Sequence, residues 1–140
     1  MSDVKIKVAT TVNVPIDKVW NCWVQPACIV KWNSASMDWH TVNATNDLKV
    51  GGRFLYRMEA KDGSVGFDFW GVYETVLDQE LLEIRLGDGR KMSVEFKPTD
   101  NGTEITEIFD AETENSVELQ RFGWQSILNN FKKIVESEND

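Results

Sequence analysis

The 140-residue sequence has a formal net charge of −8, and 41% of its residues are hydrophobic. This length and apolar content suffice for the core of one domain, which we predict to span residues 1–140, and they exclude a disordered chain. The negative charge opposes phosphate groups, so we expect neither nucleic acid nor an anionic membrane surface as a partner.

The start of the chain lacks the features of a targeting segment. Residues 1–14 contain no uninterrupted apolar core and no small-residue cleavage site, which argues against a signal peptide. No apolar run in the sequence approaches the length that spans a bilayer. Cys22 and Cys28 lack CxxC spacing, so we expect a cytoplasmic protein whose two thiols stay reduced. We also expect a monomer.

The N-terminal third of the chain predicts one strand and two short helices. Residues 5–12 are rich in β-branched side chains, which indicates a strand. Pro15 suits the start of a helix, and apolar residues recur at helical spacing between positions 16 and 23. Pro26 ends this helix and opens a shorter one that extends to about residue 31.

From residue 37 onward the apolar pattern changes to the period of two that is typical of strands. We predict strands at residues 38–42, 52–59, 67–76, 81–86, 91–97 and 103–109. Tight turns such as Asp62-Gly63 separate them, which predicts an antiparallel meander. A final helix over residues 117–136 has one apolar face and a length of roughly 30 Å, enough to cover the apolar face of the sheet. The fold class is therefore α+β.

Several short motifs support this architecture through a family resemblance. In chain order they are Val14-Pro15 with Val19-Trp20, Pro26 with Trp32, Gly51-Gly52-Arg53-Phe54, Gly71-Val72-Tyr73-Glu74, Gly102-Thr103-Glu104-Ile105-Thr106, and Gly123-Trp124. Together they resemble the START-like (SRPBCC) superfamily, and within it the homologues of the activator of the 90-kDa heat-shock protein ATPase. The resemblance implies a helix-grip fold, in which a curved antiparallel sheet wraps around a long C-terminal helix and two short helices follow the first strand. Gln25 and Asn33 depart from the family pattern, which often has an acidic and an aromatic residue there.

Two interpretations remain open for the space between the sheet and the last helix. One is an ordinary packed core. The other is a pocket for a small apolar or aromatic ligand, because such pockets have mainly apolar walls with a few polar groups. The candidate pocket residues are Trp32, Phe54, Tyr56, Phe67, Phe69, Tyr73, Glu107, Trp124 and Leu128.

Glu107 is the most informative polar residue in this set. Strict alternation along residues 103–109 places its side chain on the inward face, where a carboxylate is costly and often marks a site. The alternative, which we favour, is a β-bulge that turns Glu107 outward and Ile108 inward. Cys22, beside an apolar helix face, is expected to be an inert thiol, and Cys28 is expected to have a structural role.

No cofactor or metal ion is predicted. His40 is the only histidine, and no cluster of Cys or Asp at ligand spacing accompanies it. Motifs for nucleotide binding and for serine or zinc hydrolysis do not occur.

Three functions remain in consideration. The leading one is a binding module for a small apolar molecule. The family resemblance implies a second, a co-chaperone that is a partner of a heat-shock ATPase. The third is an enzyme of the cyclase, hydrolase or lyase type, in which polar groups such as Glu107, His40, Tyr56 and Tyr73 act as acid or base.

Overall fold

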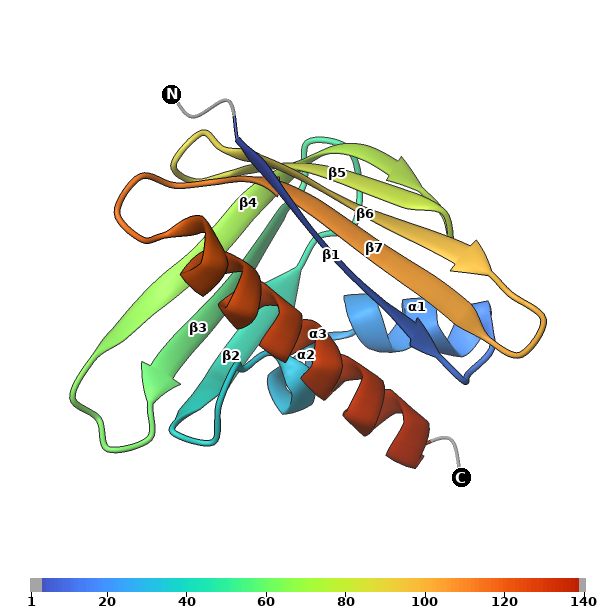
Figure 1. Cartoon of the computed structure of the whole chain (residues 1–140), viewed down its shortest axis with the longest axis horizontal. Helices are drawn as coiled ribbons and strands as arrows, with labels where there is room; N and C mark the ends of the chain where they lie inside the picture. Colours follow the sequence, from blue (N-terminus) through green and yellow to red (C-terminus); the bar gives the residue numbers. More distant parts are fainter. Residues whose placement is uncertain (1–3, 139–140) are drawn as a thin grey trace.

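A computed structural model describes residues 4–138, which form a curled seven-stranded antiparallel sheet and three helices (Figure 1). The elements in chain order are β1 (Lys5–Val12), α1 (Ile16–Val24), α2 (Pro26–Trp32), β2 (Trp39–Asn46), β3 (Arg53–Ala60), β4 (Gly66–Leu77), β5 (Leu81–Leu86), β6 (Lys91–Pro98), β7 (Thr103–Asp110) and α3 (Val117–Glu138). The predicted α+β helix-grip fold is confirmed, with the long last helix lying along the concave side of the sheet.

The sheet has the strand order β1-β7-β6-β5-β4-β3-β2, so the first strand pairs with the last. The chain must therefore travel from one edge of the sheet to the other between β1 and β2. Helices α1 and α2 make this crossing and lie at one end of the concave side (Figure 1). All the later strands follow one another as an antiparallel meander, as the turn pattern predicts.

Two irregularities in strand pairing accompany the curvature of the sheet. One lies between Thr41 and Asn43 in β2, and the other lies between Tyr73 and Thr75 in β4. Bulges of this kind bend a strand and increase its twist. The first one also explains why the predicted strand stopped at Val42, since the extra residue interrupts the alternation there while the strand continues to Asn46.

A cluster of aromatic rings joins the three helices at one end of the molecule. Phe131 of α3 is fully buried and contacts Trp23 and Trp32 edge to face, with ring centroids 4.9 and 5.1 Å apart. Trp23 and Trp32 stack on each other at 4.8 Å. The Trp32 indole nitrogen donates a hydrogen bond of 3.0 Å to the Cys22 carbonyl oxygen, so its burial leaves no polar atom unpaired. This cluster fixes the C-terminal half of α3.

Cys22 and Cys28 form a disulfide in the structure, so the expectation of two reduced thiols was wrong. The two residues lie on α1 and α2, and their Cα atoms are 5.2 Å apart, which is within the range that a disulfide requires. The break between the helices at Gln25 turns α2 back against α1. Sequence spacing alone does not reveal this approach.

Candidate functional site

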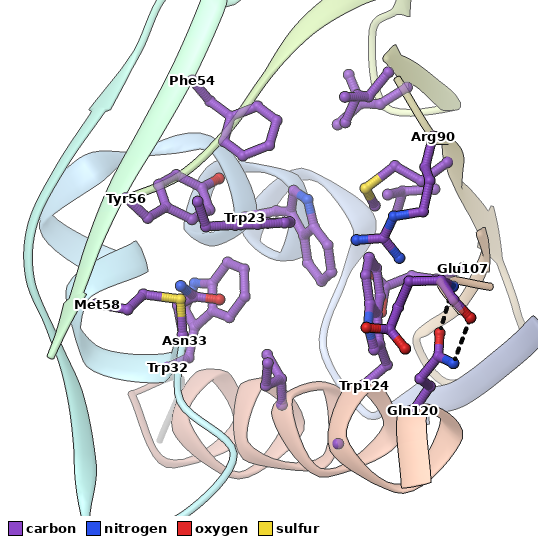
Figure 2. Close-up of a pocket in the computed structure, with 18 of the residues that line it drawn as sticks. Trp23, Trp32, Asn33, Phe54, Tyr56, Met58, Arg90, Glu107, Gln120 and Trp124 are labelled. Atoms are coloured by element: carbon purple, nitrogen blue, oxygen red, sulfur yellow. Dashed lines mark hydrogen bonds between the residues drawn. The ribbon is translucent and has the colours of Figure 1, made fainter. Parts of the chain in front are cut away.

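A cavity of about 380 Å³ lies between the concave face of the sheet and α3 (Figure 2). It exists because α3 packs mainly against β1 and α2 and leaves the middle of the sheet uncovered. Its walls come from strands β3 to β7, from the inner side of α3, and from Trp23, Trp32 and Asn33 near the ends of α1 and α2. Ligand pockets in proteins have volumes of roughly 300–1,000 Å³, so this space falls in their range.

Most of the residues predicted from the sequence meet at this cavity. Those on its walls are Trp32, Phe54, Tyr56, Phe67, Phe69, Tyr73, Glu107 and Trp124. Leu128 is fully buried but lies in the core, away from the cavity wall. Phe67 is 47% exposed, because it is near the end of the β3–β4 hairpin, where its ring is 5.8 Å from that of Trp39. Phe67 therefore lies at the exposed edge of the cavity wall.

Glu107 points inward, and the bulge that we favoured from the sequence is absent. Strand β7 pairs with β1 and β6 in continuous register, with Val8 and Val94 opposite Glu107. Alternation therefore persists through the strand: Glu107 is 6% exposed, whereas Ile108 is 37% exposed on the outer face. Within residues 4–138, no side chain or backbone group donates a hydrogen bond to the Glu107 carboxylate. Burial in these surroundings raises the pKa of Glu107 to about 8.

Two tyrosines on neighbouring strands also line the cavity, and they differ in their hydrogen bonding. The Tyr73 hydroxyl donates a hydrogen bond of 2.6 Å to Asn46 Oδ1, and Asn46 Nδ2 donates one of 2.8 Å to the Val24 carbonyl oxygen. The Tyr56 hydroxyl has no such partner in the described part of the chain. Burial, and then the proximity of Tyr73 and Glu107, raises the pKa of Tyr56, so it remains a neutral hydroxyl.

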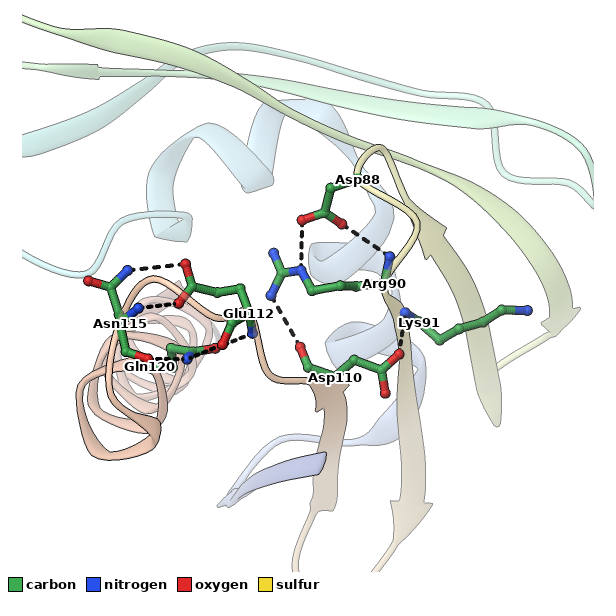
Figure 3. Close-up of polar contacts among 7 residues, drawn as sticks. All are labelled: Asp88, Arg90, Lys91, Asp110, Glu112, Asn115 and Gln120. Carbon is green, nitrogen blue, oxygen red and sulfur yellow. Dashed lines mark hydrogen bonds and ion pairs between the residues drawn. The ribbon is translucent and has the colours of Figure 1, made fainter. Parts of the chain in front are cut away.

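The loop that leads into α3 lines one part of the cavity, and Figure 3 shows its polar contacts. Gln120 holds this loop: its Nε2 donates to the carbonyl oxygens of Glu112 and Asn115 at 3.1 and 2.9 Å, and its Oε1 accepts from the Glu112 backbone nitrogen at 2.9 Å. The Glu112 carboxylate in turn accepts a bond of 2.6 Å from the Asn115 backbone nitrogen. This part of the cavity wall is therefore a hydrogen-bonded polar loop.

Arg90, in the β5–β6 turn, also lines the cavity, and Figure 3 shows its polar contacts. Its Nε donates to Asp88 Oδ2 at 2.7 Å, and its Nη1 donates to the Asp110 carbonyl oxygen at 3.2 Å. Sequence reasoning missed Arg90 because it belongs to a turn. Gln120 carried a signal, since it interrupts the apolar face of the last helix with a polar side chain.

His40 and the two cysteines lie outside the cavity wall. His40 is half-buried on β2, and it does not join Glu107 or the tyrosines. Among residues 4–138, no three His, Cys, Asp or Glu side chains form a group that could hold a metal ion. The polar side chains on the cavity wall carry carboxyl, hydroxyl and amide groups and the guanidinium group of Arg90.

Comparisons with known proteins agree on the family and on the fold. A family model described as Activator of Hsp90 ATPase homolog 1-like protein matches residues 13–136. A solved structure of an AHSA1-like protein from Aeromonas hydrophila is 45% identical, with a TM-score of 0.92 over 97% of this chain and 94% of that one. The solved structure of a protein from Cytophaga hutchinsonii is 50% identical, with a TM-score of 0.83 over 96% of this chain and 94% of that one.

More distant structures share the fold alone. A protein from Nitrosomonas europaea is 21% identical and has a TM-score of 0.82, with 96% of each chain covered. No curated protein matches the sequence. In the part of the chain that the structure describes, no helix has both the length and the apolar character needed to cross a membrane.

Proposed function

Because the chain belongs to the family of Activator of Hsp90 ATPase homolog 1-like proteins, whose START-like domains typically bind ligands, we propose that it binds a small, largely apolar molecule between the sheet and α3. The observation that carries this proposal is the cavity of about 380 Å³ with aromatic walls and two buried polar groups, Glu107 and Tyr56, that have no hydrogen-bond partner within residues 4–138.

Packing and polar pairing both support an occupant. Protein interiors are close-packed, and an empty space costs stability in proportion to its volume. The oxygen atoms of Glu107 and Tyr56 form no hydrogen bond within residues 4–138, yet they are not sealed from the cavity, so they are available to a partner that enters it. A ligand with an apolar body and one polar group would fill the space and pair with Glu107 or Tyr56.

The proposal can be tested by native mass spectrometry of the purified protein, followed by a thermal-shift screen with fatty acids, sterols and flat aromatic compounds. We expect one class to raise the melting temperature, because a ligand that binds only the folded state stabilises it. We also expect a change in tryptophan fluorescence, because Trp23, Trp32 and Trp124 line the cavity. Failure of every class, with no co-purified molecule, would favour the co-chaperone function instead.

A substitution at Gly123 separates cavity filling from unfolding. Gly123 lies in α3 on the cavity wall, and a Cβ atom placed there meets no atom within 4 Å. We expect Gly123→Leu to occupy the cavity and weaken ligand binding by roughly tenfold or more, about 1.4 kcal/mol. The free energy of unfolding should stay equal or rise, because glycine inside a helix costs roughly 0.5–1 kcal/mol relative to alanine.

The matched control is Gly123→Ala, measured by the same titration and by urea denaturation. It should give the gain in stability from helix propensity with a smaller loss of binding. Equal ligand affinity in the leucine variant and the unmodified protein would show that the ligand binds elsewhere.

A further inference from the structure

The polar groups of the cavity come from opposite sides of the curled sheet. Glu107 is on β7 and Tyr56 is on β3, with β4, β5 and β6 between these strands in the sheet. The two side chains line one cavity only because the sheet curls, and they are close enough for the carboxyl group to influence the pKa of the hydroxyl. They form no hydrogen bond with each other in the described structure. A polar group of a ligand can therefore bind between them.

The charges around this space favour a cation over an anion. Arg90 is the one basic side chain on the part of the cavity wall that residues 4–138 form. Its guanidinium group already donates hydrogen bonds to the Asp88 carboxylate and to the Asp110 carbonyl oxygen. Glu107 and Glu112 are the acidic residues on the same wall. A carboxylate or phosphate on the ligand would be repelled by the ionised form of Glu107, and the one basic group on the wall, Arg90, is already partly paired.

The aromatic walls favour the same type of ligand. Trp23 and Trp32 lie at one end of the cavity, and Trp124 lies at the other end beside Glu107 (Figure 2). The faces of such rings attract ammonium groups, and this attraction is larger where water is excluded. The Trp124 ring is itself fixed, because it stacks on Phe109 with centroids 3.7 Å apart.

From these observations we infer that the ligand is an apolar amine, whose protonated nitrogen binds the Glu107 carboxylate while its apolar body lies against the aromatic rings. The Tyr56 hydroxyl oxygen, on the same cavity wall, can accept a hydrogen bond from the ammonium group, which helps to stabilise a buried ion pair. This inference rests on the proposed binding function and names the chemical class of ligand.

Binding of an ammonium ion at this position releases a proton. Four other titratable groups line the same cavity wall: Tyr56 from β3, Tyr73 from β4, Arg90 from the β5–β6 turn and Glu112 from the β7–α3 loop. The described residues of α3, β1 and β6 contribute no titratable group to this wall. Burial raises the pKa of Glu107 to about 8, so the empty protein holds this group protonated at pH 7. The Glu107 proton leaves to solvent when the ammonium ion enters.

The experiment uses three probes with one apolar body: 4-phenylbutylamine, 4-phenylbutan-1-ol and 4-phenylbutanoate. Calorimetric titrations at pH 6, 7 and 8 give the affinities, and two buffers with different ionisation enthalpies give the number of protons released. We expect the amine to bind most tightly at pH 8 and to release close to one proton at pH 6. Its affinity should rise roughly tenfold from pH 6 to pH 7 and about fivefold from pH 7 to pH 8, as proton linkage to a group with a pKa of about 8 requires. The alcohol should show neither effect.

Glu107→Gln keeps the shape of the side chain and removes its charge. We expect this variant to lose the preference for the amine, so that it binds the amine no more tightly than the alcohol. The matched control is Glu104→Gln, which makes the same change on the exposed side of β7 and should retain the preference for the amine.

Equal binding of amine and alcohol, or a preference for the carboxylate, would overturn the amine inference and leave the proposed binding function intact. Persistence of the amine preference in Glu107→Gln would overturn it as well. If none of the three probes binds and every class in the thermal-shift screen also fails, both proposals are overturned.

Discussion

Replacing Glu107 with glutamine should stabilise the ligand-free protein by an amount on the order of 3–5 kcal/mol at pH 8, and by much less at pH 4.5. Burial raises the pKa of Glu107 in the folded protein from the ordinary value of 4.5 to about 8. Between these values the unfolded chain has released the proton and the folded chain still holds it. Folding is therefore coupled to proton uptake, and stability decreases as pH rises through this window.

The slope that Glu107 contributes is about −1.4 kcal/mol per pH unit between its two pKa values, and it is zero above and below them. Glutamine has no charged form, so the variant lacks this contribution. Other carboxyl groups, such as Asp110, whose pKa is lowered by its hydrogen bonds with Lys5 and Lys91, contribute equally to both proteins and cancel in the difference.

Urea denaturation of both proteins at pH 4.5, 6 and 8 would measure this effect, with the exposed Glu104→Gln as the control. The stability difference between Glu107→Gln and the unmodified protein should widen as pH rises. A difference that is the same at all three pH values would show that Glu107 is ionised in the folded protein.

Truncation of Phe131 to alanine should destabilise the protein by roughly 3–5 kcal/mol, the range for large aromatic residues in cores. Its ring is fully buried and packs against Trp23 and Trp32, so the variant loses both contacts and leaves a void between three helices. Because these helices hold one end of the cavity, binding of any ligand should weaken as well.

Phe122→Ala is the matched control, since it makes the same change on the same helix at a side chain that is 70% exposed. We expect its effect to stay within about 0.5 kcal/mol, as for most surface substitutions. Chemical denaturation of the two variants side by side would measure the contrast. Similar losses in both would contradict the packing of α3 described above.

The fold followed from the sequence because local patterns and long-range pairing agree along most of the chain. The alternation of Phe54, Tyr56 and Met58 predicted which face of β3 is buried, and all three are at most 8% exposed. Strand β2 was the exception, since its bulge breaks the alternation that the prediction used. A local pattern does not show where a neighbouring strand imposes a bulge.

The candidate site was harder to predict, because it depends on elements far apart in the sequence. The pattern of β7 alone left the orientation of Glu107 open, and only its unbroken pairing with β1 and β6 decides that the carboxyl group faces inward. Arg90 and Gln120 reach the cavity wall from a turn and from a helix. The disulfide likewise depends on how α2 folds back on α1.

The pairing of the first strand with the last has a consequence for synthesis of the chain. β1 finds its partner only when β7 is available, because Lys5 pairs with Asp110 and Val12 pairs with Thr103. At translation rates of roughly 5–20 residues per second, the first strand waits on the order of 5–20 s before its partner leaves the ribosome. Helix α3 packs on β1 and follows β7 in the chain, so the space beneath the sheet takes its final form only after both β7 and α3 have been made. The non-local closure of the sheet should limit the folding rate.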